Sequence, residues 1–183
     1  MQPGGTCDDR ASRWRASVRA FDPELTVLLV GAWEALDFTV AGHTYVHGTP
    51  EHERELARIA ARSIRPLTAR GGHVALLEVP PFGDPLHDAD GGQRSDPSSV
   101  ANVNDALRAV ARRDPDHVTF VRWTSAIAPD GRFDATVDGV SVRPDGVHFV
   151  SIAATRFPTG RLVPILRRLA IEAHEHRDAG TAQ

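Results

Sequence analysis

The stretch Leu25-Thr26-Val27-Leu28-Leu29-Val30-Gly31 is a continuous apolar run that ends at a glycine. A run of this kind fits a strand that is buried on both faces, as the strands of a parallel sheet are. Two similar runs follow, at residues 73–79 before Pro80-Pro81 and at residues 117–123. Together the three runs predict three strands of one parallel sheet.

Helical patterns separate these strands. Residues 14–21 form a short arginine-rich helical pattern, Pro50 opens a helix that runs to about residue 70, and Pro97 opens another. The last helix spans residues 151–173, after a small hairpin over Asp138-Gly139. This alternation predicts a three-layer α/β domain with a parallel sheet over residues 1–173. Residues 174–183 are expected to form a disordered tail.

Composition excludes several classes of protein. A chain of 183 residues fits one domain, and its net charge of −3 gives no basic surface for nucleic acid or anionic lipid. The single cysteine, Cys7, forms neither an intrachain disulfide nor a zinc knuckle. The N-terminus lacks the pattern of a signal peptide, and no apolar run approaches the length of a membrane span. We therefore expect a soluble, cytoplasmic chain.

The turn Asp145-Gly146-Val147-His148 places an aspartate three residues ahead of a histidine, just before the last helix. A serine-hydrolase triad needs such a pair. There, His148 would take a proton from an attacking hydroxyl, and Asp145 would fix the tautomer of the imidazole. The alternative is that Asp145 caps the helix and His148 is an ordinary surface residue, since this spacing alone is a weak motif.

The segment Gly31-Ala32-Trp33-Glu34 follows the first strand directly. Loops at the carboxyl ends of parallel strands form the site in folds of this class. A glycine here allows close backbone approach, and the N–H groups after it could hold an oxyanion. We therefore predict that Gly31, Trp33 and Glu34 form a rim beside Asp145 and His148. The alternative is a glycine that merely ends a strand, with Trp33 filling the core.

Three histidines lie close together in the sequence, at His43, His47 and His52, with Glu51 and Glu53 nearby. These residue types can bind a metal ion. However, the sequence does not place two of these histidines four residues apart on a helix, as a metal-binding helix would. Glycines and a proline interrupt the segment. The sequence favours a solvated loop over a metal site.

The features above, taken together, resemble the SGNH (GDSL-type) hydrolase superfamily. The resemblance spans residues 18–169 and is carried by Gly31-Ala32-Trp33-Glu34, the polar loop after Pro80-Pro81-Phe82, the hairpin at residues 137–140 and Asp145-Gly146-Val147-His148-Phe149. It is strongest to the SGNH domains attached to actinobacterial membrane acyltransferases, which O-acylate cell-surface glycans. The resemblance implies a flavodoxin-like α/β/α sandwich and a Ser-His-Asp triad without metal or organic cofactor. In that triad His148 would be the base and Asp145 its partner.

The chain departs from this family before the first strand. Family members begin with a strand that ends in Gly-Asp-Ser, the nucleophile, and no such strand precedes Val27. Trp33 stands where many members have an asparagine that binds the oxyanion. We therefore expect an N-terminally incomplete SGNH domain, related to enzymes acting on acyl esters of carbohydrates but inactive alone. An upstream polypeptide or a second copy would complete its sheet. The alternatives are a non-catalytic module that binds a glycan or a protein, and a gene fragment without independent function.

Overall fold

The computed structural model describes residues 10–84 and 91–181. Three parallel strands form the main sheet, in the order β1-β4-β5, and two small antiparallel hairpins accompany it. The elements in chain order are α1 Arg10–Phe21, β1 Leu25–Leu28, β2 Phe38–Val40, β3 His43–Tyr45, α2 Pro50–Thr68, β4 His73–Leu77, α4 Pro97–Arg113, β5 Val118–Val121, the 3₁₀ helix η1 Thr124–Ala126, β6 Thr136–Val137, β7 Val140–Ser141 and α5 Ser151–Thr181. The predicted α/β class and parallel sheet are confirmed.

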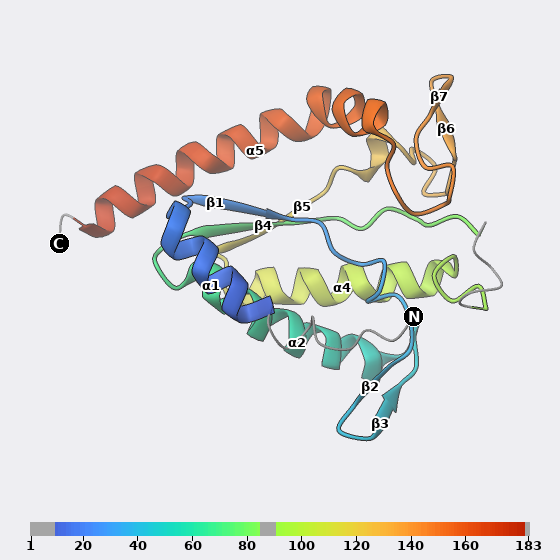
Figure 1. Cartoon of the computed structure of the whole chain (residues 1–183), viewed down its shortest axis with the longest axis horizontal. Helices are drawn as coiled ribbons and strands as arrows, with labels where there is room; N and C mark the ends of the chain where they lie inside the picture. The colour runs from blue at the N-terminus through green and yellow to red at the C-terminus, as the bar shows by residue number, and fades with distance from the viewer. Residues whose placement is uncertain (1–9, 85–90, 182–183) are drawn as a thin grey trace.

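Helices cover both faces of the sheet. In Figure 1, α5 lies over one face, and α2 and α4 lie side by side under the other. The central strand β4 is apolar on both faces: Val74 and Leu76 pack toward α2 and α4, whereas Ala75 and Leu77 pack toward α5. This two-sided burial is what its unbroken apolar sequence predicts.

Strand β1 lies at an edge of the sheet. Its register pairs it with β4 alone, and within the described residues no strand pairs with its other side. Val27 is 42% exposed and Leu29, just beyond the strand, is 47% exposed. An apolar edge strand without a charged residue is unusual in a folded protein, because its free N–H and C=O groups can pair with another chain.

Both helices beneath the sheet begin at well-formed caps. Thr49 precedes Pro50 of α2 and its side-chain oxygen accepts a hydrogen bond from His52 N. Asp96 precedes Pro97 of α4 and accepts one from Ser98 N. A side-chain oxygen followed by proline is a strong signal for a helix start, because it satisfies a free N–H group and the proline lacks one.

The structure differs from the sequence analysis in two places. Residues 38–45 form the β2–β3 hairpin, not a loop; Ala41 and Gly42 make its turn with φ of 51° and 82°, and Phe38 stacks on Tyr45. Helix α5 continues past residue 173 to Thr181 instead of giving way to a disordered tail. The extension is held to the turn before β1, where His174 Nδ1 lies 2.7 Å from a carboxylate oxygen of Glu24.

Candidate active site

The Asp145–His148 turn folds into a hydrogen-bonded pair. One oxygen of Asp145 accepts hydrogen bonds from Val147 N at 3.0 Å and His148 N at 2.7 Å. Its other oxygen lies 2.7 Å from His148 Nδ1. Because an ionised carboxylate only accepts hydrogen bonds, Nδ1 carries the hydrogen, and Nε2 is left to accept a proton when the ring is neutral.

Electrostatics keep Asp145 ionised. Partial burial raises its pKa, but the hydrogen bonds from the His148 ring and from the Val147 and His148 amides outweigh burial and lower the pKa to about 2. The side chain of His148 is 81% exposed, and within the described residues its Nε2 has no hydrogen-bond partner. The pair therefore has the charge and the free nitrogen that a general base requires.

A buried arginine lies under this turn and was missed by the sequence analysis. Arg143 is fully buried and donates from Nη1 to Pro81 O at 2.7 Å, which ties the turn to the loop after β4. Its guanidinium carbon lies 4.9 Å from the ring centre of Phe133 and 5.3 Å from that of Phe149. Burial lowers its pKa to about 10, so it stays charged at neutral pH. No local pattern separates it from the other arginines, because its partners are distant in sequence.

The predicted rim residues face the same cavity as His148. The cavity has a volume of about 360 Å³ at the carboxyl edge of the sheet, and its lining includes Gly31, Trp33, Glu34 and His148, together with Val79, Phe82 and Phe149. Trp33 is 77% exposed, so the alternative that it fills the core is wrong. The structure thus brings Gly31, Trp33, Glu34 and His148 to one cavity. Asp145 contacts His148 but does not itself line the cavity.

One detail of the rim differs from the oxyanion role considered for this segment. Gly31 N donates to a carboxylate oxygen of Glu34 at 2.8 Å, so this amide is already occupied. Gly31 has a φ of 135°, and a side chain there would collide with Val79, because an added Cβ would lie 2.6 Å from both of its methyl carbons. The glycine therefore allows β1 and the end of β4 to approach closely.

An asparagine of α4 fixes the other wall of the cavity. Asn104 accepts a hydrogen bond from Val79 N at 2.8 Å and donates to Val79 O at 3.0 Å, and both bonds are buried. These two bonds continue the ladder of β4 after its strand pairing has ended. Asn104 was not among the site residues predicted from the sequence.

The described lining of the cavity contains no nucleophile. No serine, threonine or cysteine belongs to it among the residues whose side chains the structure describes, 11–84, 91–151 and 160–179. Ser125 accepts a hydrogen bond from Arg161 at 3.1 Å, and Ser63 lines a different, apolar cavity under β1. Cys7 lies outside the described residues.

A second Asp-x-x-His turn provides an internal comparison. Asp114 and His117 have the same spacing as Asp145 and His148, and their Nδ1–Oδ1 distance is 2.9 Å. This pair precedes β5, whereas the rim residues follow β1 and the Asp145–His148 turn lies beside them. The hydrogen bond therefore forms in both of these turns, and the surrounding cavity distinguishes the candidate site.

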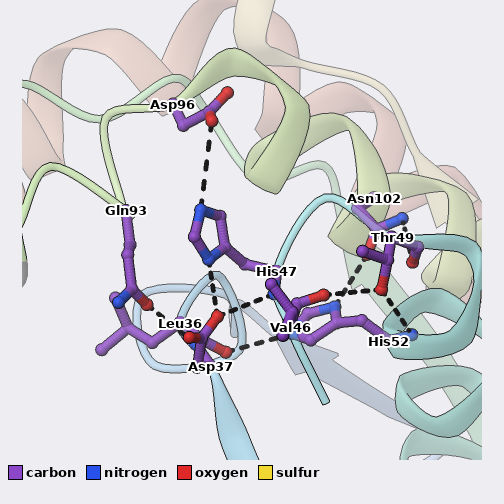
Figure 2. Close-up of polar contacts among 9 residues, drawn as sticks. All are labelled: Leu36, Asp37, Val46, His47, Thr49, His52, Gln93, Asp96 and Asn102. Carbon is purple, nitrogen blue, oxygen red and sulfur yellow. Dashed lines mark hydrogen bonds and ion pairs between the residues drawn. The ribbon is translucent and has the colours of Figure 1, made fainter.

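The histidines considered for a metal site have protein partners instead, and Figure 2 shows those of His47 and His52. His47 Nδ1 lies 2.6 Å from Asp37, and its Nε2 is 4.0 Å from Asp96. The buried His52 has both ring nitrogens engaged, by Asn102 Oδ1 at 2.7 Å and Leu36 O at 3.0 Å. In the part of the chain that the structure describes, no group of three or more metal-binding side chains comes together.

The third histidine, His43, also has a protein partner. His43 pairs with Glu51, with 3.1 Å between Nε2 and the carboxylate oxygen. Partial burial raises the pKa of Asp37, but the backbone and ring hydrogen bonds from His47 lower it by more, so the net shift of the pKa is downward. This cluster joins the β2–β3 hairpin, the start of α2 and the segment before α4, which is a structural role.

None of the helices within the described ranges is long and apolar enough to cross a membrane. In comparisons with known proteins, no protein-family model matches the chain, and no curated protein matches it in sequence.

Proposed function

We propose that this chain is the base-bearing part of an SGNH-type serine esterase or O-acyltransferase, with a flavodoxin-like fold completed by a further segment. The observation that carries the proposal is the Asp145–His148 pair beside a cavity that Gly31, Trp33 and Glu34 also line. The substrate class would be an acyl ester of a carbohydrate. The chemistry uses no metal or organic cofactor.

In this proposal His148 moves the proton and Asp145 orients the ring. A serine hydroxyl attacks the carbonyl carbon of the ester while its proton passes to His148 Nε2. The bond from the carbonyl carbon to the sugar oxygen then breaks, and that oxygen takes the same proton and leaves as a hydroxyl. An acyl-serine remains. Water or an acceptor hydroxyl attacks that intermediate, again through His148, and regenerates the serine. Asp145 stays ionised throughout and stabilises the imidazolium.

The serine must come from outside this sequence, which contains no Gly-Asp-Ser. A strand paired in parallel with the free side of β1 would bring its carboxyl end to the edge where Gly31 lies. Either an upstream polypeptide or a second copy could occupy that edge. Because a second copy also lacks the nucleophile, the proposal favours an upstream segment.

The test compares two proteins: the chain alone, and the chain extended at its N-terminus by the polypeptide that the preceding coding sequence specifies. We expect no turnover of 4-nitrophenyl acetate by the chain alone. The extended protein should turn over the ester, and His148→Ala should reduce its rate by about 10²–10⁴-fold. His117→Ala is the matched control, because that histidine has the same Asp-x-x-His contact away from the cavity. Turnover by the chain alone that depends on His148 would show that one of its own serines is the nucleophile.

A second candidate is a non-catalytic module that binds a glycan. The observation in its favour is Trp33, which is largely exposed on the rim with the Arg94 guanidinium carbon 5.6 Å from its ring centre. An exposed aromatic ring offers a flat apolar surface for a sugar ring. Inactivity of the extended protein, combined with quenching of Trp33 fluorescence by oligosaccharides and its loss in Trp33→Ala, would favour this function.

A further inference from the structure

A second cavity lies under β1, on the side of the sheet away from α5. It has a volume of about 50 Å³ and an almost wholly apolar wall. Five elements contribute to it: α1 through Trp14, β1 through Leu28, α2 through Ile59 and Ala60, β4 through Leu76, and α4 through Ala106. We call this cavity the apolar crevice.

The apolar crevice shares two lining residues with the cavity of the candidate site. Val30 and Glu34 belong to the linings of both. Alternation along β1 and the residues after it places these side chains: Leu28 and Val30 pack with the cluster under the sheet, whereas Leu29 faces the cavity that contains His148. The hydrogen bond from Gly31 N holds the carboxylate of Glu34, which belongs to both linings.

Size and polarity limit what the apolar crevice can hold. A water-sized group needs roughly 10–15 Å³ of such volume, so about 50 Å³ accommodates about four carbon atoms. Water is a poor occupant, because it needs two to four polar partners and the wall offers little besides Ser63 and Glu34. A short alkyl chain fits both limits.

We propose that the apolar crevice binds the alkyl end of a short acyl group, of about four carbons, whose carbonyl end lies in the cavity beside His148. The ligand class is therefore a short-chain carboxylic ester, and the crevice selects the acyl chain length. This inference rests on the proposed function for the identity of the ligand, but binding of the alkyl chain needs no nucleophile and is measurable in the chain alone.

The experiment measures binding of a homologous series of primary amides, from acetamide to octanamide, by two-dimensional NMR of the ¹⁵N-labelled chain. Each methylene that enters the crevice should tighten binding by about fourfold, up to about four carbons, after which the gain should stop. The amide signals of Val30 and Glu34 should shift with the longer ligands.

Two variants change the crevice in opposite directions. Ala60→Leu fills it and should abolish the gain with chain length, whereas Ile59→Ala enlarges it and should move the limit to longer chains. Ala61→Leu is the matched control, because the neighbouring residue lines a separate surface groove with Arg58 and Arg62. If filling unfolds the chain, loss of dispersed NMR signals will report it, and Ile59→Ala still tests the inference.

The outcomes separate this inference from the proposed function. Affinity that does not change with chain length, or the same chain-length limit in Ile59→Ala as in the unmodified chain, would overturn the apolar crevice as a binding site. A chain-length limit that moves as expected, together with an inactive extended protein, would support the crevice and reject the esterase.

Discussion

Asn104 carries the sharpest prediction about stability. Its side-chain amide makes two buried hydrogen bonds to the backbone of Val79, at 2.8 and 3.0 Å. Val79 is only 2% exposed, so water cannot readily replace these partners. Asn104→Ala would leave one N–H and one C=O group of Val79 buried and unpaired.

The expected loss follows from those two groups. Each buried polar group left without a partner costs about 1–3 kcal/mol, so Asn104→Ala should lower the free energy of unfolding by about 2–6 kcal/mol. This is a large part of the roughly 5–15 kcal/mol that stabilises a typical domain. Asn104→Asp should also destabilise the chain, because it keeps an acceptor for Val79 N but turns a second acceptor toward Val79 O.

The assay is urea denaturation followed by far-ultraviolet circular dichroism. Asp105→Ala, at the next position of the same helix, is the control: its carboxylate is 53% exposed and pairs with Arg108 at the surface. Exposed pairs of this kind contribute about 0.2–1 kcal/mol. If Asn104→Ala costs no more than Asp105→Ala, the two hydrogen bonds do not stabilise the end of β4 and the reasoning is wrong.

Three further substitutions test the site and the sheet edge. Gly31→Ala should destabilise by about 1–3 kcal/mol from backbone strain and more from contact with Val79; Gly139→Ala, with a φ of 72° and open space around it, reports the strain alone, so equal losses would exclude the contact. Asp145→Asn should lower the free energy of unfolding above pH 3.8, the usual pKa of an aspartate. Because the pKa of Asp145 in the folded chain is about 2, the difference between variant and parent should fade as the pH drops toward 2. A difference that is constant with pH would contradict this expectation. Val27→Lys should suppress association in sedimentation velocity, since it puts a charge on the exposed edge of β1, and a chain that is already monomeric at high concentration would show that this edge does not self-associate.

Local signals in the sequence account for the sheet and for the Asp145–His148 contact. Each of the three apolar runs became a parallel strand. The central strand β4 is buried on both faces, as predicted, whereas β1 lies at the edge of the sheet with Val27 exposed. The Asp-x-x-His contact lies within a four-residue turn, and its recurrence at Asp114 and His117 indicates that this local spacing favours it. Placing Gly31, Trp33 and Glu34 beside His148 needed one more rule, the common edge of parallel strands.

Features that depend on distant partners were not predictable from the sequence. Arg143 contacts Pro81, 62 residues away, and Asn104 contacts Val79, 25 residues away, so neither has a local pattern. Helix α5 extends to Thr181 through contacts such as that of Arg177 with Asp22, at a separation of 155 residues. The β2–β3 hairpin was missed because its Ala41-Gly42 turn lacks the Asn-Gly or Asp-Gly pair that marks such turns.

The open side of β1 lies beside the candidate site, where the proposed function requires a nucleophile. Neighbouring strands lie about 4.8 Å apart, so a parallel strand added beside β1 would end about that distance from Gly31. The residue just after such a strand would then lie at the mouth of the cavity that His148 and Trp33 line. Pairing there would also cover the exposed side chains of Val27 and Leu29. One added strand would therefore remove an unusual apolar edge and bring the nucleophile that the proposed function requires to the candidate site. For this reason we favour completion by an upstream segment over a role for the chain alone.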